Sequence, residues 1–168
     1  MAAPILVGYA TRSGSTTEVA EAVAATLRDQ GLDVDLQPIK EVRFLSDYRA
    51  VVLGAPLFMF RWHKDARHFL SRNRQALEGR PAAVFALGPF HDDEKEWREV
   101  RAQLDKELAK FPWFQPLSIE VFGGRFDPKL LTFPWKLLPG LGKMPPSDIR
   151  DWSKIRSWAS ELAEMLRN

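Results

Sequence analysis

Three short apolar runs constrain the fold of this chain more than any other feature of its sequence. They occupy residues 5–10, 50–55 and 82–87. Unbroken runs of this length are typical of strands that are buried on both faces of a parallel sheet. We expect the second of these strands to stop at Pro56 and the third to stop at Gly88. The sequence therefore predicts three strands in the interior of a sheet.

Two further segments, residues 33–37 and 118–121, alternate apolar and polar residues. Such alternation indicates strands with one solvated face. Between the five strands, apolar residues recur at spacings of three and four, as in amphipathic helices. The helical stripes are Val19, Ala20, Val23, Ala24 and Leu27; Ala66, Phe69, Leu70, Asn73 and Leu77; Trp97, Val100, Leu104 and Leu108; and Trp152, Ile155, Trp158, Ala159, Leu162 and Leu166.

This alternation of strands and helices predicts an α/β fold with a doubly wound, five-stranded parallel sheet and helices on both faces. The strand order 2-1-3-4-5 puts the two alternating strands at the edges and the three apolar strands inside. A sheet with this order binds its ligand in the crevice where strands 1 and 3 diverge. The length of 168 residues fits a single domain over residues 1–168.

The composition excludes several classes of function. The chain has no cysteine, which excludes disulfides, thiolate metal sites and a cysteine nucleophile, and we predict no metal site. The net charge is only +2, with a pI of about 9.0. This basic bias is too weak to predict binding to nucleic acid. No stretch approaches the roughly 18 apolar residues of a bilayer-spanning helix, and we expect a cytoplasmic protein.

The loop after the first strand, residues 11–17, is rich in hydroxyl side chains. Five of its seven residues are Ser or Thr, with a glycine at the centre. Amides and hydroxyls that converge at a helix N-terminus bind a phosphate dianion, whereas the same string on its own is equally typical of a polar helix cap. Its place after the first buried strand favours the phosphate. The expected phosphate-binding residues are Thr11, Arg12, Ser13, Gly14, Ser15 and Thr16.

Other phosphate-binding motifs do not fit this chain. It contains no Gly-x-x-x-x-Gly-Lys-Ser/Thr string, and no Gly-x-Gly-x-x-Gly follows the first strand. A P-loop NTPase and a dinucleotide-binding site are therefore not expected. The first strand also ends without acidic residues, unlike that of a receiver domain.

The string from Gly8 to Thr16 resembles the FMN phosphate loop of flavodoxins. It is more similar still to the flavodoxin-like protoporphyrinogen dehydrogenases of the quinone-dependent type, in which a Thr-Arg pair precedes the glycine. Gly54-Ala55 with His63 after it, and Asp151-Trp152 at the last helix, also match that family. The resemblance implies a flavodoxin-like fold, an FMN cofactor, and oxidation of protoporphyrinogen IX in haem biosynthesis with a quinone-type acceptor.

The chain departs from that family in its second loop. Phe58 and Phe60 stand where the family usually has an arginine and a glycine, and the loop from Gly88 to His91 is not close either. The substrate therefore stays open. The alternative is a flavodoxin-type electron carrier without its own small-molecule substrate, although such carriers are usually strongly acidic and this chain is slightly basic.

An isoalloxazine ring needs apolar or aromatic walls and a few backbone N–H groups at its edge. The loops after the third and fourth strands offer such walls. The residues expected to contact the ring are Pro56, Leu57, Phe58, Met59 and Phe60, followed by Gly88, Pro89 and Phe90. Each aromatic ring taken alone is about as often part of a core. Loops at the carboxyl ends of strands face the crevice, which favours flavin contact for the loop as a whole.

Four further side chains lie near the expected crevice. His63 and His91 can donate a proton or hold a carboxylate, but a structural role is favoured because flavin chemistry often needs no protein acid or base. Arg61 and Lys64 are placed to attract an anionic substrate, for example one with propionate groups, and ordinary solvation explains them at least as well. We assign no catalytic residue.

The segment from residue 123 to 146 interrupts the alternation as an apolar, basic insertion. It holds Leu, Phe and Trp residues with only lysines between them, and no acidic residue from 128 to 147. One interpretation is a flap over the end of the sheet or over the cofactor. The other is contact with a membrane surface or a partner through residues 128–143. The favoured interpretation is a flap that also contacts a membrane surface or a partner.

Overall fold

The structure, a computed structural model, describes residues 3–167. The strands are β1 (Ile5–Tyr9), β2 (Val34–Pro38), β3 (Ala50–Phe58), β4 (Arg61–Trp62), β5 (Ala82–Leu87), β6 (Ser118–Phe122), β7 (Arg125–Phe126) and β8 (Ser147–Asp148). The α-helices are α1 (Ser15–Asp29), α2 (Lys64–Arg72), α3 (Arg74–Glu78), α4 (Glu94–Ala109), α5 (Pro139–Gly142) and α6 (Trp152–Leu166).

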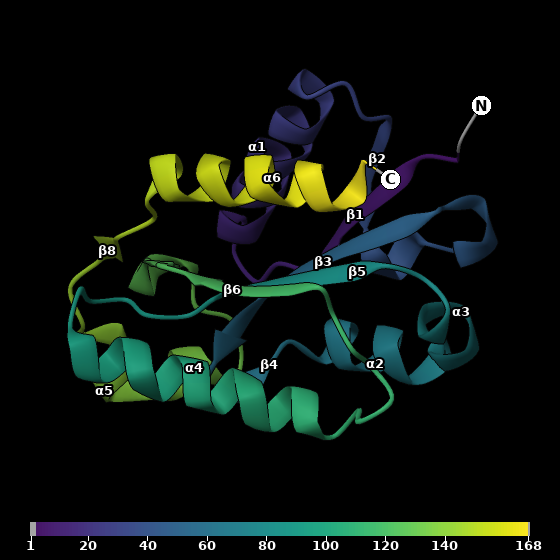
Figure 1. The fold of residues 1–168 in the computed structure, drawn as a ribbon. Helices are drawn as coiled ribbons and strands as arrows, with labels where there is room; N and C mark the ends of the chain where they lie inside the picture. The colour runs from purple at the N-terminus through teal and green to yellow at the C-terminus, as the bar shows by residue number, and fades with distance from the viewer. Residues whose placement is uncertain (1–2, 168) are drawn as a thin grey trace.

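The five long strands form a parallel sheet in the order β2-β1-β3-β5-β6 (Figure 1). Ile5 of β1 stands opposite Val34 of β2 on one side and Ala50 of β3 on the other. The predicted order 2-1-3-4-5 is therefore confirmed. So is the position of the two alternating strands, which lie at the edges.

Helices cover both faces of this sheet, as predicted. Helices α1 and α6 pack on one face, and α2, α3 and α4 lie on the other (Figure 1). Val19, Val23 and Leu27 of α1 are fully buried because their spacing keeps them on one side of the helix. The second core contains Phe69 and Leu104. The three inner strands face a core on each side, which explains their unbroken apolar runs.

Strand β3 does not stop at Pro56, so that expectation is wrong. The strand runs on to Phe58 and then turns back into β4, with Leu57 opposite Trp62. Pro56 still has Leu87 of β5 as its neighbour, while β1 ends opposite Gly54. A proline is tolerated here because β3 has already lost its partner on one side.

The stripe from Ala66 to Leu77 is divided between two helices rather than carried by one. Helix α2 ends before Asn73, whose side-chain amide donates to the carbonyl oxygen of Phe69 at 2.8 Å. Helix α3 begins directly afterwards. Hydrogen bonds of this kind compete with the helical ones, which explains the break. Ala66, Phe69 and Leu77 nevertheless share the predicted core.

The insertion has a closed base at the carboxyl end of the sheet, on the left in Figure 1. Strands β7 and β8 pair antiparallel, with Arg125 opposite Asp148 and Phe126 opposite Ser147. Short 3₁₀ turns and α5 fill the segment between them. Within residues 3–167, no helix is both long and apolar enough to span a bilayer.

Candidate functional site

The phosphate loop, residues 11–17, turns sharply into α1 at the carboxyl end of β1. Gly14 precedes the helix with φ at +93°, a left-handed conformation that favours glycine. Its amide donates to Thr11 Oγ1 at 2.9 Å, so Thr11 shapes the turn. No side chain caps α1 among the described residues. The amides of Ser15, Thr16 and Thr17 lack helical partners at this end, which leaves them to bind an anion.

Thr16 provides an independent indication that a ligand belongs in this loop. Its side chain is fully buried, and Oγ1 has no hydrogen-bond partner among residues 3–167. A buried hydroxyl without a partner is costly, so such groups are rarely left unsatisfied. A phosphate oxygen held by the neighbouring amides would accept this hydrogen bond. The loop therefore fits the phosphate of a mononucleotide.

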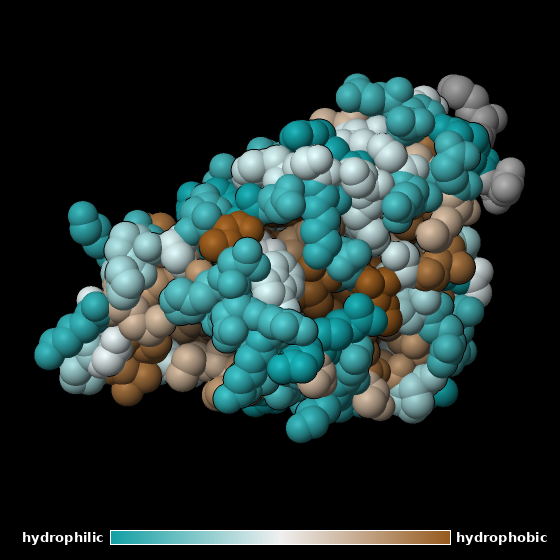
Figure 2. Space-filling model, turned by 60° about the vertical axis from the view of Figure 1, so that its left-hand side comes forward, coloured by the Kyte–Doolittle hydropathy of each residue, from teal (hydrophilic) through white to brown (hydrophobic). Residues whose placement is uncertain are grey.

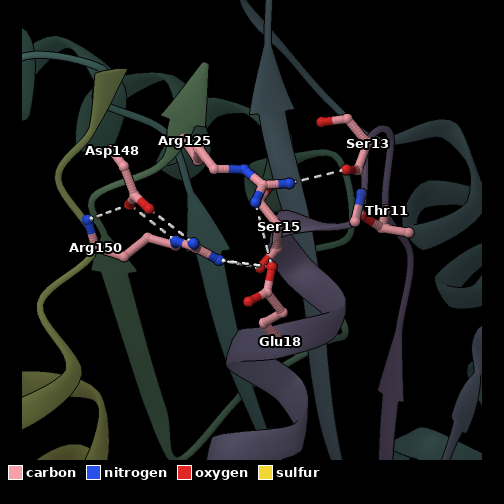
Figure 3. Close-up of polar contacts among 8 residues, drawn as sticks. Thr11, Ser13, Ser15, Glu18, Arg125, Asp148 and Arg150 are labelled. Atoms are coloured by element: carbon pink, nitrogen blue, oxygen red, sulfur yellow. Dashed lines mark hydrogen bonds and ion pairs between the residues drawn. The ribbon is translucent and has the colours of Figure 1, made fainter. Parts of the chain in front are cut away.

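Two arginines from the strands at the base of the insertion bind the backbone of the phosphate loop (Figure 3). Arg125 of β7 donates to the carbonyl oxygen of Ser13 at 3.1 Å. Arg150, which follows β8, donates to the carbonyl oxygen of Ser15 at 3.3 Å. Each guanidinium group thus binds a backbone carbonyl oxygen where the loop enters α1. The insertion and the phosphate loop form one connected unit.

Carboxylates fix these two arginines in place. Asp148 accepts two hydrogen bonds from the Arg150 guanidinium, at 2.8 and 2.9 Å, and a third from the Arg150 amide at 3.2 Å. These bonds hold the pKa of Asp148 below its ordinary value and raise that of Arg150. Glu18, in the first turn of α1, lies 3.4 Å from both guanidinium groups. The side chain of Arg150 is only 5% exposed, so its orientation is set by these partners.

A pocket opens between the phosphate loop and the carboxyl ends of β3 and β5. Its empty space of about 560 Å³ includes the open solvent at its mouth. We call it the crevice pocket. It is lined by Arg12, Ser13, Ser15, Pro56, Leu57, Phe58, Leu87, Phe90, Gly124, Arg125, Phe126, Asp127, Leu130, Leu131, Thr132 and Trp135.

Seven of the expected cofactor-binding residues line this pocket, namely Arg12, Ser13, Ser15, Pro56, Leu57, Phe58 and Phe90. The others lie close by in different roles. Thr11, Gly14 and Thr16 form the turn and the buried base of the phosphate loop. Met59 and Phe60 lie at the tip of the hairpin between β3 and β4. A side chain at Gly88 would collide with Val100 of α4, so Gly88 allows close packing there. The carbonyl oxygen of Pro89 accepts a hydrogen bond from the amide of Gly124, which connects this loop to the start of the insertion.

Aromatic rings form one wall of the crevice pocket. Phe58 lies edge-on to Trp135 of the insertion, with centroids 5.4 Å apart, and 6.3 Å from Phe90. Phe90 in turn lies 5.2 Å from Phe126. The Arg12 guanidinium lies 4.8 Å from the centroid of Phe58. The wall is largely aromatic, and such rings suit the flat apolar faces of an isoalloxazine ring. Leu130, Leu131, Thr132 and Trp135 of the insertion line the same pocket, and we call residues 130–135 the flap.

The two histidines have different surroundings. His63 caps α2, with Nδ1 accepting the amide of Asp65 at 3.1 Å, so the other ring nitrogen carries the proton in the neutral form. Burial lowers the pKa of His63; Asp65 opposes this shift, and Arg12 adds to it. His91 is exposed, 3.4 Å from Glu96. His63 thus has a structural role at the helix start, and His91 lies outside the crevice pocket.

Sequence reasoning missed Arg125, Arg150 and Glu18 as supports of the phosphate loop. It also did not place Phe126 and Trp135 at the pocket wall individually. The basic residues of the insertion were visible as a group, but the pairing of β7 with β8 brings the two arginines together. No local pattern in the sequence encodes that pairing.

Comparisons with known proteins agree with this geometry. The family described as flavodoxin domain matches residues 6–137. The quinone protoporphyrinogen IX dehydrogenase of Escherichia coli (strain K12) is 22% identical, over 95% of this chain and 94% of its own. The enzyme of the same name from Leishmania major is 24% identical, over 94% of this chain and 73% of its own.

Solved structures show the same fold. A short-chain flavodoxin associated with a non-canonical PDU bacterial microcompartment superimposes with a TM-score of 0.63 at 15% identity, over 99% of this chain and 97% of its own. A flavodoxin from the domain Archaea gives a TM-score of 0.61 at 13% identity, over 98% and 99%. The family match, the sheet order and the loop geometry agree: the chain belongs to the flavodoxin domain family.

Proposed function

We propose that this protein binds FMN in the crevice pocket and works as an FMN-dependent oxidoreductase. The observation that carries the proposal is the buried, unpartnered hydroxyl of Thr16 at the base of a phosphate-binding loop, beside an aromatic pocket. Thr16, Ser13 and the first amides of α1 would hold the phosphate. Pro56, Leu57, Phe58 and Phe90 would enclose the ring.

When bound, FMN supplies the redox chemistry, which is acceptance of electrons from a reduced donor and their transfer to an acceptor. The chain's own residues bind and orient it. Arg125 and Arg150 would hold the backbone of the phosphate loop in place through the carbonyl oxygens of Ser13 and Ser15. The flap at residues 130–135 would shield the bound ring from water, and exclusion of water strengthens each polar contact inside the pocket.

We further propose protoporphyrinogen IX as the electron donor and a quinone as the acceptor. The support is the likeness to the two dehydrogenases over nearly the whole chain, at 22 and 24% identity. The alternative is a flavodoxin that carries electrons between proteins. The fold suits both functions. However, such carriers usually have a strongly acidic surface for docking to their partners, whereas this chain has a net charge of +2.

A quinone acceptor would also explain why the insertion exposes apolar residues. Leu130, Phe133, Leu137 and Leu138 are exposed, and lysines at 129, 136 and 143 lie among them. Figure 2, which brings this side of the molecule forward, shows apolar surface between hydrophilic side chains. Apolar residues beside lysines suit the interface of an anionic bilayer, where quinones dissolve. We propose that residues 128–143 contact a membrane surface.

The cofactor proposal is tested by the visible spectrum and the flavin content of the purified protein. We expect a yellow protein, or one that takes up added FMN at one molecule per chain. Mass spectrometry of the heat-released flavin distinguishes FMN from FAD. A colourless protein that does not bind added FMN contradicts both the enzyme and the carrier.

Steady-state oxidation of protoporphyrinogen IX separates the two functions. We expect porphyrin fluorescence to appear in the presence of a quinone and to require bound FMN. The matched comparison is the same protein with a reduced redox protein as donor in place of protoporphyrinogen. FMN-loaded protein that exchanges electrons only with the redox protein is a carrier.

A further inference from the structure

A second hollow lies beside the crevice pocket and is strongly cationic. It encloses about 870 Å³ of empty space that opens to solvent. Arg12 comes to it from the phosphate loop, Arg61 from β4, and Lys64 and Arg67 from α2. We call it the cationic recess. Four basic side chains from two separate parts of the chain, the phosphate loop and residues 61–67, thus converge on one space.

The positive charge of the recess is only partly neutralised by the protein. Arg67 donates to the carbonyl oxygen of Trp62 at 3.1 Å and lies 3.9 Å from Glu107. Arg61 and Lys64 form no ion pair with any residue from 3 to 167. In the same part of the chain, no aspartate or glutamate lines the recess. Its charge therefore favours an anionic occupant.

The recess and the crevice pocket share a wall. Arg12, Phe58, Thr132 and Trp135 line both. The shared part includes the aromatic rings of Phe58 and Trp135, whereas Arg61 and Lys64 line only the recess. A ligand with an apolar ring and carboxylate arms fits this division. Its ring would lie against Phe58 and Trp135, next to the proposed flavin, and its arms would reach the cations.

We propose that the cationic recess binds the carboxylate groups of the electron donor, with Arg61 and Lys64 as the residues that select an anionic ring compound. This inference rests on the proposed function, because it places the donor beside the FMN pocket. Arg61 and Lys64 are specificity-determining residues and take no part in the redox step. Arg67 is held by Glu107 and Trp62, so it shapes the recess.

The experiment measures binding of a porphyrin to the FMN-loaded protein by fluorescence anisotropy. The probes are protoporphyrin IX, which has two carboxylates, and its dimethyl ester, which has the same ring without the charges. The test variant is Arg61→Gln with Lys64→Gln, and the matched control is Arg43→Gln with Lys40→Gln. All four side chains are exposed, so folding is expected to survive, which circular dichroism checks.

We expect the double variant at 61 and 64 to bind protoporphyrin IX about tenfold more weakly or worse, since contacts between charged groups are the strong ones. The control variant should bind like the unchanged protein. The dimethyl ester should bind weakly to all three proteins, with no effect of the substitutions. Arg61→Lys, which keeps the charge, should retain most of the affinity.

Two results would overturn the proposal. One is equal affinity for the acid and the ester in the unchanged protein, and the other is unchanged affinity of the double variant for the acid. Measurement of protoporphyrinogen oxidation distinguishes failure of the proposed function from failure of the proposed recess. If protoporphyrinogen oxidation is absent but binding still depends on Arg61 and Lys64, the enzymatic function fails and the recess stands. If oxidation proceeds with the same kcat/KM in the double variant, the function stands and the recess fails.

Discussion

At the scale of single residues, Thr16 is the most informative side chain of the site. A buried hydroxyl without a partner is expected to weaken the ligand-free protein and to strengthen the ligand complex. Thr16→Val keeps the shape and removes the hydroxyl. A hydrogen bond to a charged group contributes about 1.5–3 kcal/mol, so we expect FMN affinity to fall roughly tenfold to a hundredfold. Flavin fluorescence titration measures this.

The same substitution has an opposite effect on the FMN-free protein. We expect its thermal midpoint to stay the same or to rise, because no hydrogen bond is lost. Thr26→Val is the matched control, since Thr26 lies at the other end of α1 and bonds to Ala22. It should leave FMN affinity unchanged. Thr16→Val protein with full FMN affinity would show that the hydroxyl does not touch the phosphate.

The ionisation of Asp148 makes the free energy of unfolding depend on pH. Its hydrogen bonds with Arg150 lower its pKa below the ordinary value of 3.8. A depressed carboxylate pKa stabilises the folded state above the unfolded pKa, and this contribution is lost as the pH falls below it. We expect Asp148→Asn to be less stable than the unchanged protein at pH 6. The difference should shrink below about pH 4. Urea unfolding from pH 3 to 7 measures it, and a constant difference would contradict the assignment.

At the scale of elements, β7 and β8 matter because they carry arginines to the phosphate loop. Arg150→Lys keeps the charge but cannot bond to Ser15, Asp148 and Glu18 in the same geometry. We expect FMN affinity to fall about tenfold, the cost of roughly one hydrogen bond. Amide hydrogen exchange at residues 13–17 should become faster. Arg156→Lys on the exposed side of α6 is the control, and equal effects of the two variants would contradict a role in positioning.

The hairpin between β3 and β4 is strained at its tip. Met59 and Phe60 have φ of +49° and +67°, in the left-handed region that favours glycine and asparagine. Phe60 is 72% exposed, so little packing opposes its replacement. We expect Phe60→Gly to raise the free energy of unfolding by up to about 1 kcal/mol, as left-handed strain is relieved. Phe44→Gly, also at an exposed phenylalanine but with φ at −134°, should lower it. Denaturant unfolding distinguishes the two.

The elements differ in how far the sequence determines them. The runs at 5–10 and 82–87 are unambiguous because strands buried on two faces need apolar residues at each position. The hairpin at 58–61 could not be predicted, since Met59-Phe60 lacks turn residues. Arg125 and Arg150 also escaped prediction, because their contact with the phosphate loop depends on the long-range pairing of β7 with β8.

At the scale of the whole molecule, three features gather at the carboxyl end of the sheet. The crevice pocket is formed by the phosphate loop, β3, β5 and the insertion; the cationic recess adjoins it; and exposed apolar residues continue outward along the insertion. Trp135 of the insertion contacts Phe58 on the pocket side, whereas Phe133 and Leu137 are 70% and 65% exposed. This arrangement would let one segment cover the cofactor and face a membrane.

A vesicle assay tests that arrangement. Burial of a Leu or Phe side chain contributes about 1.5–3 kcal/mol, so Phe133→Ser with Leu137→Ser should reduce partitioning onto anionic vesicles at least tenfold. Phe44→Ser with Leu117→Ser removes two other exposed apolar residues, 68% and 52% exposed, and should bind like the unchanged protein. High salt should weaken binding, because Lys129 and Lys136 contribute attraction that salt screens. Co-sedimentation with vesicles measures each case. If both pairs of substitutions reduce binding equally, residues 128–143 have no special role, and the insertion serves only as the flap over the crevice pocket.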